Sequence, residues 1–191
     1  MYTYEISLDE KGIKFMIDKV NDLEKILTSK EILDFIADKC MKELEQICSE
    51  KLNATEDTLN ESVYRKANQY EIDKSTHTIK IFNDSVINVS EKNWMSEEKK
   101  SKYPDYEISL AKIIEYGVGY AGSVSAKSEV ENWQYDVNGH GSQGWKYKDK
   151  NDNWKSTNGF SGRYIYLTLR NRVEEKASDW IYEYIGKKMK D

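Results

Sequence analysis

The segment from Gly139 to Gly144 has the glycine spacing of a loop that binds a dinucleotide. In such a loop, written G-x-G-x-x-G, backbone N–H groups at the start of a helix contact the pyrophosphate. The loop must follow a strand and lead into a helix, whereas a strand-like Trp-Lys-Tyr-Lys follows it here. We therefore expect a turn at this place and no nucleotide cofactor.

Asp149, Asn151 and Asn153 have the alternating spacing of the first three ligands of a calcium-binding loop. The sixth position of that loop is normally a glycine and the twelfth a glutamate, but Trp154 and Phe160 stand there. Asp and Asn side chains also stabilise tight turns without any ion. The sequence therefore predicts a hairpin turn rather than a metal site.

Groups for acid–base or nucleophilic catalysis are sparse. The chain has two histidines, His77 and His140, and neither has a second metal ligand at a recognisable spacing. Acidic pairs at 97/98, 129/131 and 174/175 are typical of solvated surfaces rather than of paired catalytic carboxylates. Since a reaction centre needs a convergent set of groups, we expect a protein that is not an enzyme, with no cofactor and no metal.

Glycines and aromatic residues are concentrated between residues 113 and 163. Glycine allows close approach of two backbones, and aromatic side chains supply rigid contact area. Trp145, Tyr147 and Trp154 would form a stacking platform for sugars or single-stranded nucleic acid if they shared one face of a hairpin. They would equally serve as core or subunit-contact residues, which we favour because aromatic anchors dominate protein interfaces.

The composition indicates one domain, residues 1–191, that is large enough to bury a core. The net charge of -5 disfavours a general nucleic-acid-binding protein, which needs clustered Lys and Arg. No apolar run is long enough to span a membrane, and no signal peptide follows Met1. Cys40 and Cys48 lie ~12 Å apart along a helix, too far for a disulfide. We expect a reduced protein made in the cytoplasm, with no membrane partner.

The spacing of apolar residues predicts an α+β fold. N-terminal helices come first, a small central antiparallel sheet with a Trp-bearing hairpin follows, and a long C-terminal helix closes the chain. The expected helices are residues 9–27, a second one that Thr28 opens, 109–116 and 164–187. The expected strands lie near 62–64, at 78–82, at 86–89, and in a hairpin of 145–149 with 153–157. The charged residues 90–108 are expected to form an exposed excursion.

Two residue pairs predict where the first helices begin. Ser7 with Glu10 and Thr28 with Glu31 each have the spacing of a capping box. Each helix is apolar on one side only, so each must pack against something else. The expected stripes are Ile13, Met16, Ile17, Val20, Leu23, Ile26 and Leu27; then Ile32, Leu33, Ile36, Cys40, Leu44, Ile47, Cys48 and Leu52; and in the last helix Ile165, Leu169, Val173, Ala177, Trp180, Ile181, Tyr184 and Ile185.

The segment Ile-Ile-Glu-Tyr-Gly-Val-Gly, residues 113–119, resembles a hydrophobic-Glu-Tyr-Gly-Thr-Gly segment of one known family. That family comprises the small tail-completion, or head–tail joining, proteins of tailed bacteriophages and prophages. The resemblance continues through Gly-Trp-Lys-Tyr-Lys-Asp at 144–149, Trp154, and the turn at 158–163, and it covers residues 79–186.

Two features depart from the family's pattern: Val118, where threonine is common, and the polar stretch 90–108. The resemblance implies a structural subunit of the virion neck, without enzymatic activity, that packs as a ring. The ring is typically sixfold in this family. The implied partners are copies of the chain itself, the head connector or adaptor on one side, and the tail terminator or tail tube on the other. DNA would meet the subunit only while passing through the channel.

The resemblance also implies which residues shape the contacts of the ring. These are Glu115, Tyr116, Gly117, Gly119, Gly144, Trp145, Tyr147, Trp154, Gly159, Gly162 and Arg163. We expect Arg163 to fix the start of the terminal helix or to pair across the ring, and Gly117→Val to spoil assembly while leaving the fold largely intact. A carbohydrate- or cell-surface-binding module that uses the Trp hairpin remains the alternative function.

Overall fold

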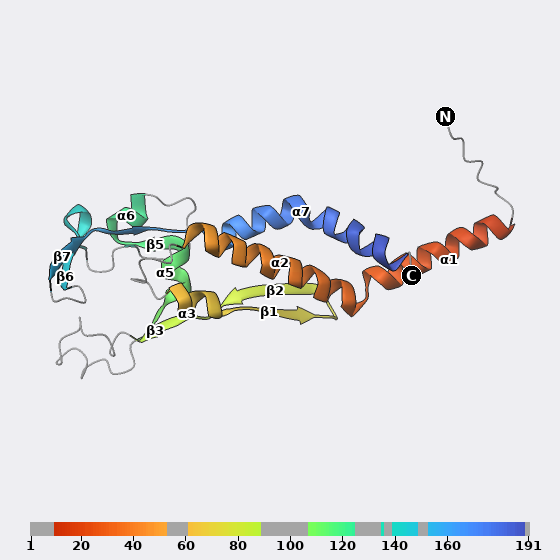
Figure 1. Cartoon of the computed structure of the whole chain (residues 1–191), viewed down its shortest axis with the longest axis horizontal. Coiled ribbons are helices and arrows are strands. Elements are labelled where there is room, and N and C mark those ends of the chain that lie inside the picture. Colours follow the sequence, from red (N-terminus) through yellow and green to blue (C-terminus); the bar gives the residue numbers. More distant parts are fainter. Residues whose placement is uncertain are drawn as a thin grey trace, which may run out of the picture. The chain divides into compact units, whose positions relative to one another are not determined.

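The computed structural model describes residues 10–52, 61–88, 107–124, 135, 139–148 and 153–189, which form a mixed α+β structure (Figure 1). The helices are α1 (Glu10–Leu27), α2 (Lys30–Lys51), α3 (Glu61–Lys66), α5 (Leu110–Tyr116), α6 (Gly119–Val124) and α7 (Ile165–Lys188). The strands are β1 (Asn68–Asp73), β2 (Thr78–Asn83), β3 (Val86–Asn88), β4 (Glu107–Ser109), β5 (Gly117–Val118), β6 (Trp145–Lys148), β7 (Trp154–Thr157) and β8 (Gly159–Ser161). The predicted fold class, the N-terminal helices and the long C-terminal helix are confirmed.

The antiparallel pairing that the sequence predicts takes the form of small two-stranded sheets. In the described ranges β1 pairs with β2, β3 with β4, β5 with β8, and β6 with β7. The last three pairs are antiparallel, and β6 with β7 is the predicted Trp-bearing hairpin. Because most of these strands are only two to four residues long and helices interrupt them, each strand pairs with a single neighbour.

The chain divides into two compact units. The first, called unit 1, comprises the described residues up to Lys42, Tyr70–Lys80, and those from Arg172 onward. The second, called unit 2, comprises the described residues within Glu43–Gln69 and Ile81–Asn171. Each unit therefore contains part of the long helices α2 and α7, and each has its own packing. A single domain over 1–191 stays a prediction.

Unit 1 is built around Ile32 and Leu33 of α2 and Tyr184 of α7, all buried. Apolar residues of α1, α2, α7 and the β1–β2 pair pack on this cluster: Ile26, Phe35, Ile36, Ile181, Ile72 and Ile79. Trp180 is buried as well. The predicted apolar stripes of the second and last helices therefore do face a core in this unit.

Unit 2 buries the other half of the α2 stripe. Its fully buried side chains come from α2, α3, α5 and the start of α7: Leu44, Ile47, Cys48, Tyr64, Leu110, Ile114 and Ile165. Both Cys40 and Cys48 are buried and form no disulfide, as their spacing predicts.

The start of α2 differs from the prediction by one residue. The backbone N–H of Ile32 donates to the Ser29 hydroxyl, so Ser29 caps the helix (3.4 Å). The Thr28 hydroxyl instead donates to the carbonyl of Glu24 inside α1 (2.8 Å). Thr28 as the cap is therefore wrong, because its side chain is used by the preceding helix. Ser7 lies outside the described residues.

The segment before the first hairpin also differs from the prediction. Residues 62–64 belong to the helix α3, and the strand β1 begins four residues later at Asn68. The strand near 62–64 is wrong because Tyr64, on a helical turn, reaches the core and is fully buried. At the other end of the expected excursion, Glu107 and Ile108 lie in β4 and pair with β3. Residues 90–106 lie outside the described part.

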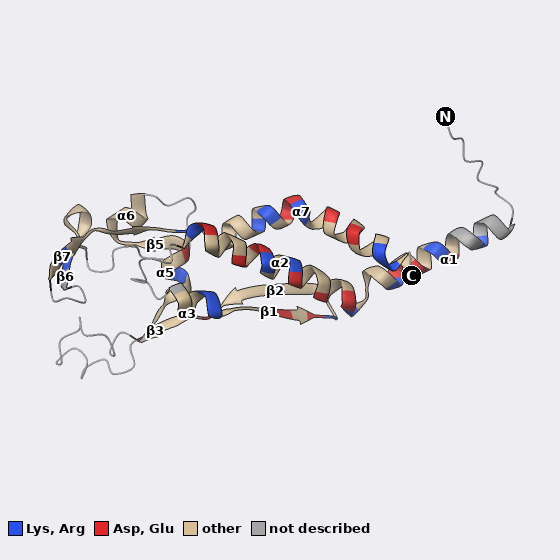
Figure 2. Cartoon of the chain, viewed as in Figure 1, with Lys and Arg blue, Asp and Glu red and all other residues tan. Residues whose placement is uncertain are grey.

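Basic and acidic residues are interspersed along α2 and α7, with no basic strip on either helix (Figure 2). None of the helices in the described ranges is long and apolar enough to cross a membrane.

The ion pairs of Glu183 give a first testable expectation. Its carboxylate accepts hydrogen bonds from Lys187 (2.7 Å) and from Lys39 of α2 (2.8 Å). These bonds, that of Lys187 first, lower the pKa of Glu183 from 4.5 to about 2. Because this folded-state pKa is depressed, the stabilisation is present above pH 4.5 and is lost as the pH falls toward 2.

We expect an NMR titration of the Glu183 carboxyl carbon to show a midpoint near pH 2. The double variant Lys39→Ala, Lys187→Ala should move that midpoint up toward 4.5 because both donors are removed. A midpoint near 4.5 in the unmodified protein would refute the pairing.

Candidate functional site

Two of the segments on which the family resemblance depends are hydrogen-bonded to each other in unit 2. Gly117 pairs with Ser161 and Val118 with Phe160 in the β5–β8 pair, and Gly119 bridges to Gly159. These residues are about 40 positions apart in the sequence. The strand pair therefore joins the segment at 113–119 to the turn at 158–163.

Gly117 and Gly159 make this pairing sterically allowed. Both have positive φ angles, +83° and +99°, which L side chains rarely adopt. A Cβ atom would lie 2.4 Å from the Phe160 carbonyl oxygen at Gly117 and 1.9 Å from the Val118 carbonyl oxygen at Gly159. The expectation that Gly117→Val spares the fold is therefore wrong, since the added side chain collides with backbone.

Glu115 belongs to the interior rather than to the surface and is only 6% exposed. Its two carboxylate oxygens accept hydrogen bonds from the backbone N–H groups of Tyr166 (3.0 Å) and Leu167 (3.1 Å). These are free N–H groups in the first turn of α7, where a negative charge also interacts favourably with the helix dipole. The residue just before α7 is Tyr164, whose side chain is not of a type that caps a helix. Glu115 of α5 acts as the cap in its place.

Backbone hydrogen bonds also connect α5 to the residues just before α7. The N–H of Arg163 donates to the carbonyl of Ile114 (2.8 Å), and that of Tyr164 donates to the carbonyl of Glu115 (3.1 Å). Arg163 thus fixes the start of the terminal helix, one of the two roles expected of it, through its backbone. Its guanidinium Nε is buried.

Lys51 at the end of α2 was not anticipated from the sequence. Its ammonium group donates to the carbonyls of Arg163 (2.7 Å) and Tyr164 (3.0 Å) and to the hydroxyl of Thr168. These partners lie more than 110 residues away, so no local pattern reveals the contact. Lys51 ties the end of α2 to the start of α7.

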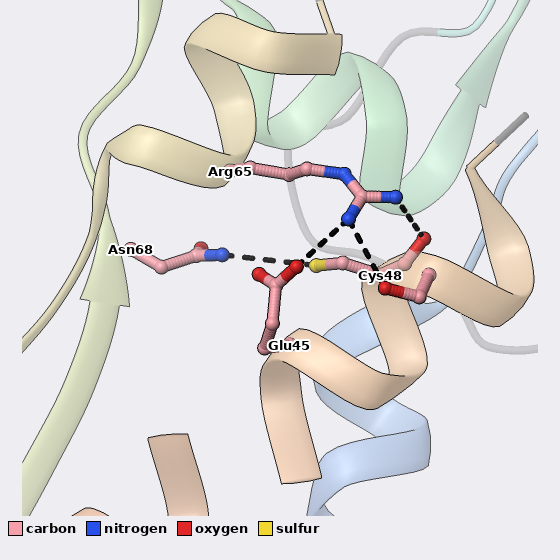
Figure 3. Close-up of polar contacts among 5 residues, drawn as sticks. Glu45, Cys48, Arg65 and Asn68 are labelled. Atoms are coloured by element: carbon pink, nitrogen blue, oxygen red, sulfur yellow. Dashed lines mark hydrogen bonds and ion pairs between the residues drawn. The ribbon is translucent and has the colours of Figure 1, made fainter. Parts of the chain in front are cut away.

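A second polar cluster, also not anticipated, links α2 to α3 (Figure 3). Arg65 of α3 pairs with the Glu45 carboxylate (2.8 Å) and donates to the carbonyl of Cys48 (3.0 Å) and the hydroxyl of Ser49 (3.2 Å). The side-chain amide of Asn68 points at the Cys48 sulfur (3.7 Å). The cluster holds the chain as it leaves α3 and enters β1.

Asn83 continues this cluster toward α7. Its amide donates to the carbonyl of Tyr64 and to the side-chain oxygen of Asn68, both at 2.7 Å. The Tyr166 hydroxyl donates to the same Asn68 oxygen (3.1 Å). Asn83 also stabilises the turn at 83–85, where its side-chain oxygen accepts a hydrogen bond from the backbone N–H of Ser85 (3.0 Å).

The hairpin register decides how its aromatic residues are arranged. Trp145 pairs with Thr157, and Trp154 pairs with Lys148. Directly paired residues share a face and successive residues alternate, so the two tryptophans lie on opposite faces of the hairpin. A platform made of Trp145 and Trp154 together is therefore wrong. The Tyr147 side chain lies outside the described residues.

The two faces have different surroundings. Trp145 is partly buried, and its ring lies 5.6 Å from that of His140. Trp154 is 67% exposed and borders an open hollow of about 490 Å³ that Lys146, Lys155 and Ser156 also line. A large aromatic beside two cations is suited to contact with an acidic or hydroxyl-rich partner.

The remaining implied residues are distributed around this hairpin and the strand pair. Tyr116 is partly buried at the end of α5, and burial raises the pKa of its hydroxyl. Gly119, Gly144 and Gly162 each approach backbone atoms closely, at Asn158, Thr157 and Glu115 respectively. The glycines and Glu115 therefore hold the shape, whereas Trp154 lies at the surface.

Burial raises the pKa values of one thiol and of several tyrosine hydroxyls in unit 2. Burial, followed by the charge of Glu45, raises the pKa of the Cys48 thiol to about 11, so it stays protonated at neutral pH. Burial also raises the pKa values of Tyr64 and Tyr166. In the part of the chain that the structure describes, no three His, Cys, Asp or Glu residues are grouped as metal ligands.

Two sequence motifs have the spacing of ligand-binding loops: the glycines at 139–144 and the Asp and Asn residues at 149–153. The described residues of both motifs lie in turns or next to strands. Gly141–Gln143 is a single 3-10 turn that leads into β6, so the glycine pattern lacks the helix that a dinucleotide loop requires. Asn153 and Trp154 enter β7, whereas Asp149 and Asn151 lie outside the described residues.

Comparison of the chain with protein-family models, with curated proteins and with solved structures finds no match.

Proposed function

We propose that this chain is a structural, non-enzymatic subunit of the neck of a tailed bacteriophage or prophage. Copies of the chain form a ring that completes the tail and joins it to the head connector. The tail terminator or tail tube lies on the other side, and DNA only passes through the channel. The residues that resemble tail-completion proteins are the basis of this proposal.

One observation supports it most. The two main segments of the resemblance, 113–119 and 158–163, lie far apart in the sequence and yet form one backbone joint. Glu115 and Arg163 complete that joint at the start of α7. Segments that pack together in this way constrain each other, as expected of motifs that belong to one shared architecture.

The division between buried and exposed residues suggests how the subunit makes contacts. The glycines and Glu115 set the geometry of the joint, and Trp154 with Lys146 and Lys155 presents a contact face. A ring needs two different faces on each subunit. The interspersed charges of α2 and α7, which offer DNA no basic strip, are compatible with a channel through which DNA slides.

A complementation experiment tests the proposal. In a phage that encodes this chain, removal of its gene should leave filled heads and separate tails, and the wild-type chain should restore joined particles. Trp154→Ala should restore them poorly because the exposed anchor is lost. Tyr182→Ala, which removes a 73% exposed aromatic outside the hairpin, serves as the control and should restore them fully. Normal particle yield without the chain would refute the proposal.

The exposed Trp154 and its hollow also favour the second candidate, a carbohydrate- or cell-surface-binding module. Because Trp145 lies on the opposite face of the hairpin, it cannot stack on the same sugar as Trp154. A glycan titration followed by tryptophan fluorescence separates the two functions. A saturable change that Trp154→Ala abolishes would support sugar binding, and an unchanged signal would leave the neck subunit as the better account.

A further inference from the structure

The helix α1 carries an apolar stripe that the described part of the chain leaves exposed. Ile17 is 54%, Val20 63% and Leu27 44% exposed. Isolated apolar residues on a surface are ordinary, but several on one side of one helix indicate a contact surface. Near the end of α1, Ile26 packs against the core cluster of unit 1.

The spacing of this stripe is that of a coiled coil. With Val20 and Leu27 at a positions, Leu23 occupies the d position between them, and the sequence places Ile13 and Met16 at the preceding a and d positions. The helix is therefore apolar every three and four residues over its length. In parallel coiled coils, a β-branched residue at a with leucine at d, as at Val20 and Leu23, favours two strands over three or four.

Charged residues flank the stripe with the complementarity that such a pair requires. Lys19 occupies a g position and Glu24 the e position of the next heptad. In a parallel pair these two positions face each other across the interface, so Lys19 of each copy meets Glu24 of the other. Asp22 and Lys25 form an ion pair within the helix (3.9 Å) at the outward c and f positions.

We propose that α1 is a self-association element and that its partner is the α1 helix of a second copy, packed in parallel. Basic and acidic residues are balanced along α1, so the helix lacks the cationic face with which an amphipathic helix binds anionic lipid. The proposal does not depend on the neck function, because it requires only the purified chain.

The mass of the full-length chain in solution gives the first test. Light scattering or sedimentation at roughly 100 µM should show an even number of chains. Val20→Glu places a charge at an a position and should weaken association by about tenfold or more. Asn21→Glu adds the same charge one residue away, at an exposed b position, and should leave the mass unchanged. A monomeric wild-type chain, or a Val20→Glu variant that associates normally, would overturn the proposal.

Charge reversal tests the parallel arrangement. Lys19→Glu alone and Glu24→Lys alone each create like-charge contacts across the pair, so each variant should associate more weakly than the wild type. A mixture of the two variants should form the mixed pair in preference to either variant by itself, because both contacts become attractive. If the mixture shows no preference, the parallel pairing is wrong. Both outcomes of the mixing experiment are measured on the purified chain, so they do not depend on whether the chain joins heads to tails.

Discussion

Gly159→Ala is expected to lower the free energy of unfolding by about 3 kcal/mol or more. The new Cβ atom would lie 1.9 Å from the carbonyl oxygen of Val118, and the residue would have to keep a φ of +99°. Neither problem is relieved by rotating a side chain, because the atoms in the way belong to the backbone. Urea unfolding followed by far-UV circular dichroism measures the loss.

Gly186→Ala provides the matched control for this variant. Gly186 lies within α7, and a Cβ atom there would meet nothing within 4 Å. The change should raise the free energy of unfolding by about 0.5–1 kcal/mol because alanine has the better helix propensity. If Gly159→Ala were as stable as Gly186→Ala, the close packing of β5 against β8 would be wrong.

Glu115→Ala should lower the free energy of unfolding by about 2–4 kcal/mol. The substitution removes the acceptor of the Tyr166 and Leu167 N–H groups and leaves both unpaired at the start of α7. Hydrogen exchange at these two amides should then accelerate more than at amides in the middle of the helix. Equal protection of the first turn in both proteins would argue against the cap.

Two further variants separate the cap from general effects of charge. Glu115→Gln keeps a side-chain oxygen that can accept from one N–H group, so it should lose less stability than Glu115→Ala. Glu175→Ala removes an exposed carboxylate from α7 and should change stability by no more than about 0.5 kcal/mol. A loss with Glu175→Ala equal to that of Glu115→Ala would mean that only net charge matters.

The pairing of residues 113–119 with residues 158–163 could be predicted from the sequence only in part. The glycines at 117 and 159 predict tight backbone turns at those positions, and both have positive φ angles. The sequence does not show that the two turns face each other, because pairing across 40 residues leaves no local pattern. Nor does it show that Glu115, within a surface-like Glu-Tyr-Gly motif, faces the interior as a helix cap.

For the Trp-bearing hairpin, too, the sequence predicts the strands but not which face each aromatic residue occupies. Alternation of polar and aromatic residues correctly predicts β6 and β7. The register could not be counted through the turn, so the sequence left open whether the two tryptophans share one face. A shift of a single residue in register moves every side chain to the other face, which is why the pairing had to be observed.

Apolar periodicity is what the sequence by itself determined: the helices α1, α2, α5 and α7, the buried faces of α2 and α7, the buried cysteines that form no disulfide and the α+β class all follow from it. The tertiary structure alone decided the long-range polar partners, among them Lys51 with the start of α7 and Arg65 with Glu45. The reason is physical: apolar spacing follows the repeat of a local helix or strand, whereas a polar side chain bonds to whatever group the folded chain brings within reach.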